Sequence, residues 1–168
     1  RQHQINTSSR HYRTIRGFHF DLGSVRNIIL TTCNNWIIED CTFTGNLSQD
    51  RVAIHLDSSY DNITIRRCVF QWVGWAVYIL HGSTVAATNV LIEDCLFIST
   101  DYGVYVVRVN DVVVNNCFFT GCYRAMYVTN LAASTSVYLY NSIVHGNYRG
   151  LEATTLGYIV ENYNCIGV

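Results

Sequence analysis

Lysine and proline are both absent from this 168-residue sequence, and charged residues make up only 14% of it. All 11 basic residues are therefore arginines, and 12 acidic residues bring the formal net charge to −1. This balance argues against a nucleic-acid-binding surface, which would need a basic stripe. Because proline cannot donate a backbone hydrogen bond, its absence suits long uninterrupted β-ladders. Apolar residues account for 49% of the chain, which excludes an intrinsically disordered protein.

Long hydrophobic runs are missing as well. No apolar stretch approaches the roughly 18–20 residues needed to cross a bilayer. No signal peptide is visible, and the chain begins at Arg1 without methionine, so we expect a processed product or a piece of a longer protein. The length suits one domain with a sizeable core. We expect neither a membrane span nor a nucleic-acid partner.

A nine-residue phrase returns four times with a cysteine at its seventh position. It reads NWIIEDCTF, NITIRRCVF, NVLIEDCLF and DVVVNNCFF. The cysteines of these phrases are Cys41, Cys68, Cys95 and Cys117. Ser142 in YLYNSIV and Cys165 in NYNCIGV extend the series, at intervals of 22 to 27 residues. Repeats of this size are typical of solenoids. Apolar and polar residues alternate within each phrase, and this period of two predicts β-strands.

Each repeat also contains a second alternating run, namely AIHLD, AVYIL, GVYVV and AMYVT. Two or more short strands per repeat, with Gly, Asn and Asp between them, fit one coil of a parallel β-helix. Successive coils would stack at roughly 4.8 Å, the spacing of paired strands. We predict an all-β, single-stranded parallel β-helix (a solenoid) of about six coils over residues 15–168. Residues 1–14 are expected to form an N-terminal segment or the remnant of a cap.

Equivalent positions of stacked coils should form columns. The cysteines are predicted to pack inward at a corner, next to a column of phenylalanines. Because there is no CxxC pair or Cys/His cluster, we expect no zinc site. Two columns alternate in charge and would stabilise the sheet modestly: Glu39, Arg66 and Glu93, and Asp40, Arg67 and Asp94. A polar turn ladder is predicted at Asn35, Asn62, Asn89 and Asp111.

The phrases NITIRRCVF and NVLIEDCLF, with GVYVV after the second, resemble the repeats of right-handed parallel β-helix proteins of the pectate-lyase-like superfamily. The resemblance covers Ile15 to Val168. That class includes polysaccharide lyases and hydrolases, alginate epimerases, periplasmic carbohydrate-binding proteins and phage tailspikes. It implies a right-handed helix, a polysaccharide or glycan partner, and an extracellular, cell-surface or virion-surface location. It also implies a homo-oligomer or a part of a larger chain.

The outward positions of the second runs form the candidate ligand-binding surface. His55 and Asp57 occur in the run IHLD, and the similar run FHFD holds His19 and Asp21 one coil earlier. We therefore expect His19 and Asp21 to lie directly beneath His55 and Asp57. The column would continue upward through Tyr78, Tyr105 and Tyr127. Stacked aromatic side chains can bind the successive sugar rings of a glycan, but they can also serve only to stabilise the β-ladder.

Catalytic chemistry would depend on the pair Asp21 and Asp57, as general acid and base. Two carboxylates one coil apart repel, which raises the pKa of one and separates their roles. A separation of about 5 Å is typical of retaining glycosidases. His55 or Arg51 could then stabilise developing charge. No cofactor is expected, although calcium bound by three carboxylates is a further alternative, involving Asp50, Asp57 and Asp61.

Three functions remain open. We favour an extracellular or virion-associated scaffold that presents a carbohydrate-contacting face. The first alternative is a polysaccharide lyase or glycoside hydrolase, but the NTD, DD, GHG and RIK motifs of polygalacturonases and the DPHE-type motif of epimerases are absent. The second alternative is a purely structural fibre or filament subunit. Trp72 and Trp75 are expected on a turn, packed over a loop.

Overall fold

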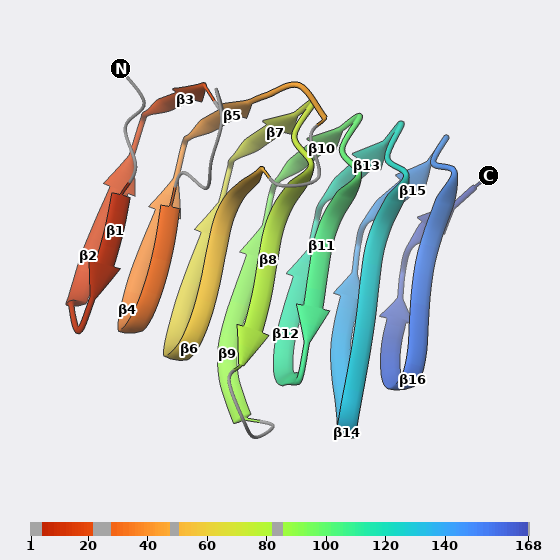
Figure 1. Ribbon diagram of the computed structural model, residues 1–168. Helices are drawn as coiled ribbons and strands as arrows, with labels where there is room; N and C mark the ends of the chain where they lie inside the picture. The colour runs from red at the N-terminus through yellow and green to blue at the C-terminus, as the bar shows by residue number, and fades with distance from the viewer. Residues whose placement is uncertain (1–4, 22–27, 48–50, 82–85, 168) are drawn as a thin grey trace.

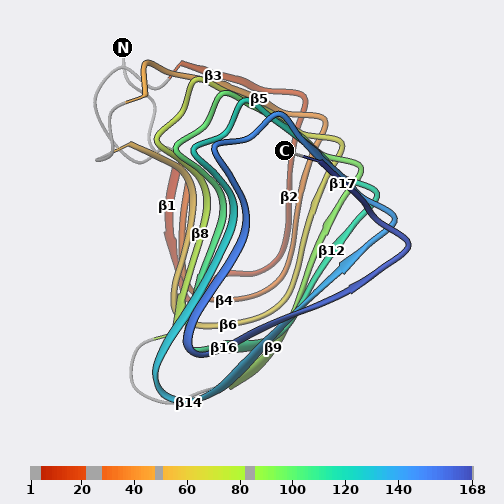
Figure 2. The same cartoon turned by 90° about the vertical axis from the view of Figure 1, so that its right-hand side faces the viewer.

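A computed structural model of the chain describes residues 5–21, 28–47, 51–81 and 86–167, and all regular secondary structure among them is β-strand. The strands form a solenoid whose coils follow one another along a single axis (Figure 1). Seen along that axis, the coils are nested and enclose one continuous core (Figure 2). Every strand pairing recorded between coils is parallel. The predicted all-β parallel β-helix of about six coils is confirmed.

The coils have three faces. The first face contains β1 (Ile5–Ser8), β8 (Trp75–His81), β11 (Tyr102–Val107) and the first halves of β4 (Ile28–Glu39), β6 (Val52–Arg66), β14 (Arg124–Tyr140) and β16 (Arg149–Asn162). The second face contains the second halves of those four long strands with β2 (His11–Arg16), β9 (Ala86–Glu93) and β12 (Val109–Asn115). The third face is a seven-stranded sheet of β3 (His19–Asp21), β5 (Thr42–Thr44), β7 (Val69–Gln71), β10 (Leu96–Ile98), β13 (Phe118–Thr120), β15 (Ile143–His145) and β17 (Cys165–Ile166).

The repeat in the sequence corresponds directly to the register of the strands. On the second face Ile38 pairs with Ile65, and Ile65 pairs with Ile92. All three side chains are fully buried. The N-terminal residues join this arrangement, because β1 and β2 both pair with β4. No helix among the described residues is long and apolar enough to span a membrane.

A column of stacked phenylalanines fills the core behind the third face. Successive ring centroids are 4.9, 4.9, 5.0 and 4.4 Å apart, and the rings are nearly parallel. The column consists of Phe20, Phe43, Phe70, Phe97 and Phe119. Burial of each such side chain contributes roughly 1.5–3 kcal/mol to stability. The predicted phenylalanine column is confirmed, and it holds the coils in register.

The cysteine column lies at the corner before the third face, as predicted. Its thiols are buried and donate to backbone carbonyls; Cys68 Sγ lies 3.3 Å from Arg66 O and 3.7 Å from Ile38 O. Ser142 takes the next place, and its Oγ accepts from the backbone N–H of Cys117 at 3.0 Å. All seven cysteines are free thiols.

The predicted end of this column at Cys165 is wrong. Cys165 pairs with Ile143 and is exposed on the third face, whereas Asn164 follows Ser142. Asn164 Oδ1 accepts from Ser142 N–H at 2.9 Å, and its Nδ2 donates to Leu139 O at 2.9 Å. An amide can satisfy a backbone donor and a backbone acceptor together, which a thiol cannot do as well.

Polar ladders occupy the corners as predicted. Asn35, Asn62 and Asn89 adopt left-handed φ values of 58°, 53° and 42°, which asparagine tolerates better than most residues. Their amides bond from coil to coil at 3.3 Å. The charge ladders are also present, with Arg66 and Arg67 2.8 and 2.7 Å from the carboxylate of Glu39. These contacts link neighbouring coils without reaching the core.

Candidate functional site

The first face carries an aromatic column, as the sequence predicts. Tyr78, Tyr105 and Tyr127 occupy equivalent positions in β8, β11 and β14, and His55 of β6 lies next to Tyr78. Ring centroids are 4.8 Å apart from His55 to Tyr78, 5.1 Å from Tyr78 to Tyr105 and 5.0 Å from Tyr105 to Tyr127. The three tyrosines are half-buried, and His55 is buried. The tyrosine rings tilt relative to one another, so parts of their faces and edges reach the surface.

The predicted positions of His19 and Asp21 are wrong. Both residues lie in β3 on the third face, where they pair with Thr42 and Thr44. The residue that pairs with His55 in the preceding coil is Ile29, and the one that pairs with Asp57 is Thr31. The similarity of FHFD to IHLD misleads because Phe20 belongs to the phenylalanine column, where it stacks on Phe43 at 4.9 Å. Core packing, not the His-x-Asp pattern, sets the register.

A second outward column lies beside the tyrosines, and sequence reasoning missed it. The predicted place of Trp75 on a turn is wrong, because Trp75 is the first residue of β8, and Trp72 is exposed and not packed over a loop. Trp75 and Tyr102 pair in register, and Arg124 follows Tyr102. The Trp75 ring meets Tyr78 and Tyr105 edge-on, at centroid distances of 4.8 and 5.4 Å. Each member directly precedes a small residue at the start of a second run, such as Ala76 or Gly103, and this is the signal that could have revealed the column. Seven residues are called the aromatic face below. Five are the aromatic residues of the two columns, namely Trp75, Tyr78, Tyr102, Tyr105 and Tyr127. The other two are Arg124 and Glu152.

Arg124 connects the two columns. Its Nη1 donates to the hydroxyl of Tyr102 at 2.6 Å, and its guanidinium lies 5.0–5.1 Å from the ring centroids of Tyr102 and Tyr127. Its Nε donates to Glu152 Oε2 at 2.5 Å. Arg149 adds an ion pair to the same carboxylate at 3.0 Å. The upper end of the aromatic face is thus a hydrogen-bonded polar network in direct contact with aromatic rings.

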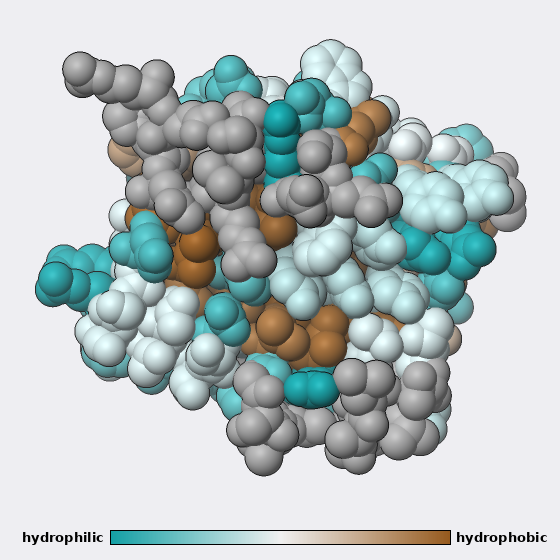
Figure 3. Space-filling model, viewed as in Figure 1, coloured by the Kyte–Doolittle hydropathy of each residue, from teal (hydrophilic) through white to brown (hydrophobic). Residues whose placement is uncertain are grey.

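Protonation equilibria on this face are displaced by its packing. Partial burial, with smaller effects from Tyr78 and Tyr127, raises the pKa of Tyr105 to about 12. Burial opposes ionisation of Glu152, but hydrogen bonds from Arg124 and Arg149 outweigh it and hold its pKa below the ordinary value. At neutral pH Tyr105 is therefore a neutral donor and acceptor, and Glu152 is a carboxylate. Figure 3 shows this face, with pale residues over β8 and β11 and a hydrophobic strip below them.

Comparison with known proteins identifies the fold family. Residues 3–165 match the family described as "Right handed beta helix region". The chain belongs to the right-handed β-helix family. Its predicted resemblance to pectate-lyase-like β-helix proteins is confirmed. No curated protein sequence matches this β-helix significantly.

One solved structure of a longer protein has a similar fold. The crystal structure of a hyperthermoactive exopolygalacturonase from Thermotoga maritima superposes with a TM-score of 0.65 at 13% sequence identity. The match covers 92% of this chain and 53% of that one, so this β-helix spans about half the length of that enzyme. At this identity the likeness concerns the fold alone.

The remaining predicted residues of the β-helix do not converge on one site. Asp57 stands in the outward column with Leu80, Val107 and Thr129, as predicted. Arg51 precedes β6, and its carbonyl accepts from Trp75 N–H at 2.9 Å. Since Asp21 is on the third face, the predicted one-coil pair with Asp57 does not form. The catalytic roles of Asp57, His55 and Arg51 remain predictions.

The calcium alternative gains no support from the described part of the β-helix. Asp61 lies at the polar corner, where its carboxylate accepts from the amides of Asn62 and Asn89. Asp57 accepts from Ser58 Oγ at 3.2 Å. Asp50 is outside the described residues. Within the described ranges, no group of three or more His, Cys, Asp or Glu side chains could hold a metal ion.

Proposed function

We propose that this protein is a rigid β-helix scaffold that binds an extended glycan across its aromatic face, outside the cell or on a virion surface. The observation that carries the proposal is the in-register aromatic column of Tyr78, Tyr105 and Tyr127 on three consecutive coils. Aromatic side chains provide apolar surface for the C–H faces of sugars, while their hydroxyl groups exchange hydrogen bonds with the polar rim. A column along the helix axis offers this surface once in every coil.

The polar end of the face supports the same role. Arg124 and Glu152 hold each other in place by a direct hydrogen bond, and both remain half-buried at the surface. Charged groups fixed in this way need little reorganisation to bond a sugar hydroxyl. A column that served only to stabilise the β-ladder would not need an ionic network at its end. The shared fold with an exopolygalacturonase is compatible with a polysaccharide ligand.

A hydrolase is the second candidate, and Asp101 is the observation that favours it. Asp101 immediately precedes Tyr102, and partial burial raises the pKa of its carboxyl, as a general acid requires. It lines a depression of about 400 Å³ with Tyr123 and Tyr148, next to the aromatic face. Glu152 is a poor proton donor, because two arginines stabilise its ionised form. The purely structural alternative predicts that no glycan binds.

A glycan array followed by product analysis on any hit separates these functions. Tyr105→Ala should weaken binding at least roughly tenfold, as expected for a central aromatic contact. The matched control is Tyr163→Ala, which removes an exposed tyrosine from the corner between β16 and β17 and should bind like the unchanged protein. New reducing or unsaturated ends that disappear in Asp101→Asn would show that the protein is an enzyme and not only a scaffold. Absence of binding to any glycan would leave the structural alternative.

A further inference from the structure

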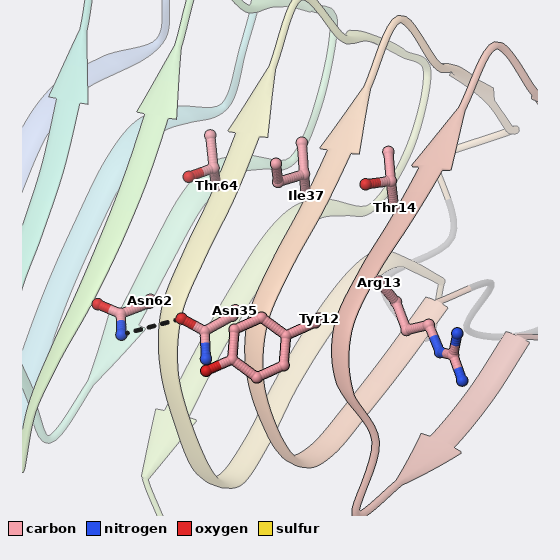
Figure 4. A pocket seen from close by; sticks show the side chains of 7 residues that line it. All are labelled: Tyr12, Arg13, Thr14, Asn35, Ile37, Asn62 and Thr64. Carbon is pink, nitrogen blue, oxygen red and sulfur yellow. Dashed lines mark hydrogen bonds between the residues drawn. The ribbon is translucent and has the colours of Figure 1, made fainter.

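The second face carries a groove that plays no part in the aromatic face. Two depressions lie along it, of about 480 and 420 Å³. The first is lined by Tyr12, Arg13, Thr14, Asn35, Ile37, Asn62 and Thr64 (Figure 4). The second is lined by Asn89, Val90, Leu91, Asp111, Val113 and Tyr138. Both are lined by residues of the asparagine corner and by outward-facing residues of the second face.

The two depressions are consecutive parts of one groove. Asn62 of the first bonds to Asn89 of the second at 3.3 Å, and Thr64 of the first pairs with Leu91 of the second. The floor is one column in continuous register along the helix axis: Ile37, Thr64, Leu91, Val113 and Tyr138. The groove therefore offers an equivalent floor position and an equivalent corner position in each coil, at roughly 4.8 Å intervals.

The corner of the groove is rich in free acceptor capacity. An amide oxygen has two lone pairs, and an amide nitrogen has two N–H donors. Asn62 Nδ2 donates to Asn35 Oδ1 and to Asp61 Oδ2, which uses both of its donors (Figure 4 shows the first bond). Asn62 Oδ1 accepts from Asn89 and keeps one lone pair. The exposed amide oxygens, and the carboxylate of Asp111, can thus accept from hydroxyl groups.

The charge of the lining limits what the groove can hold. Most of its residues are uncharged, with Arg13 in the first depression and Asp111 in the second. On the same face, Arg66 forms an ion pair with Glu39 at 2.8 Å, so this arginine is already neutralised. A row of acceptors with a single lining cation, Arg13 at one end, disfavours carboxylate or phosphate polymers along its length. The alternation of apolar floor and acceptor corner suits the C–H faces and hydroxyl donors of a sugar.

We propose that this groove is a second carbohydrate-binding surface, which takes one extended, uncharged glycan chain along the helix axis. It acts independently of the aromatic face, because the two surfaces lie on different faces and share no lining residue. The aromatic face has arginines at one end, whereas the groove has acceptor oxygens along its length. The two surfaces therefore differ in their preference for charge, and one molecule could hold two different chains.

The test is an NMR titration of the whole chain with neutral oligosaccharides of β-1,4-linked glucose, xylose or mannose, and with oligogalacturonate. At least one neutral oligosaccharide should shift the amide resonances of residues 35–37, 62–64 and 89–91. Thr64→Arg, which places a long charged side chain on the floor, should weaken that binding at least tenfold. Asn62→Gly keeps the left-handed φ but removes the amide, and should weaken binding several-fold. Oligogalacturonate should bind the groove at least tenfold more weakly.

Matched variants make the result specific to the groove. Thr42→Arg puts the same change on a half-buried outward threonine of the third face, and it should bind like the unchanged protein. Tyr105→Ala should also leave this binding unchanged. The proposal is overturned if no neutral oligosaccharide shifts those resonances, if Thr64→Arg binds as tightly as Thr42→Arg, or if oligogalacturonate competes equally. Shifts confined to the aromatic face would overturn the groove alone and leave the proposed function standing.

Discussion

Gly103 lies against the ring of Phe119, and a β-carbon on Gly103 would come within 2.9 Å of two carbons of that ring. It would also come within 2.5 Å of the carbonyl oxygen of Ala125. Phe119 is fully buried and stacked on Phe97, so it has little room to move. The absence of a side chain at Gly103 is therefore a condition for close packing between the first and third faces.

Gly103→Ala should reduce the free energy of unfolding by about 1–3 kcal/mol, because the core must shift to accept the methyl group. Gly150 occupies an equivalent position two coils later, where a β-carbon would meet Val144 at an ordinary 3.5 Å. Gly150→Ala should change stability by no more than about 0.5 kcal/mol. Urea denaturation of both variants measures the difference, and equal effects would contradict the packing argument.

Thiol reactivity should distinguish Cys165 from the other cysteines. Cys165 is exposed, whereas the other six cysteines are buried. A chromogenic disulfide reagent should modify one thiol rapidly in the native protein and all seven in denaturant. Cys165→Ser should abolish the rapid reaction and leave the slow reaction of the buried thiols unchanged. Rapid modification of several thiols in the native state would show that the cysteine column is more accessible than the structure indicates.

Acid should weaken the charge ladder when Glu39 becomes protonated. Hydrogen bonds from Arg66, and then from Arg67, lower the pKa of Glu39 below its ordinary value of 4.5, although burial opposes this. A lowered folded-state pKa means that the stabilisation is fully present above about pH 4.5 and is lost as the pH falls through the folded-state pKa. Glu39→Gln should flatten the acid branch of a plot of unfolding midpoint against pH. Glu161→Gln, on the exposed last coil, is the control and should leave that branch unchanged.

Alkaline pH should reduce the stability of the folded state through ionisation of Tyr105. Burial raises its pKa from 10.0 to about 12, so the folded state holds its proton more tightly than the unfolded state does. The resulting stabilisation is present below about pH 10 and is lost as the pH rises towards 12. Tyr105→Phe cannot ionise, so it should lose less stability over this range. Unfolding measured from pH 9 to 12, with tyrosinate absorbance, checks this; an unchanged slope in the variant would contradict it.

The fold could be predicted because every coil repeats the same local alternation. Cys41, Cys68, Cys95 and Cys117 each end a strand pattern of period two, and the structure places their columns as expected. The asparagine and charge ladders follow from the same alignment. Their local interactions are a left-handed turn or an ion pair between adjacent strands, and both can be inferred from the residue types alone.

The site was predicted less completely, for two reasons. His19 and Asp21 copy the His-x-Asp pattern of His55 and Asp57 but lie on another face, because Phe20 must join the core column. The contacts among Tyr102, Arg124 and Glu152 connect residues 22 to 28 positions apart. Such contacts depend on the length of each coil, which the loops determine, and a side-chain pattern within one strand does not reveal it.

By itself, the sequence determined the strand period, the inward columns and the αL corners, because these depend on interactions within one coil or between identical positions. Only the tertiary structure decided which residue stands above which when coil lengths differ, as for Asn164 instead of Cys165 above Ser142. The physical reason is that the register between coils follows the best packing of buried side chains and the pairing of backbone groups. Surface chemistry, including the aromatic face and the amide-lined groove, follows from that register.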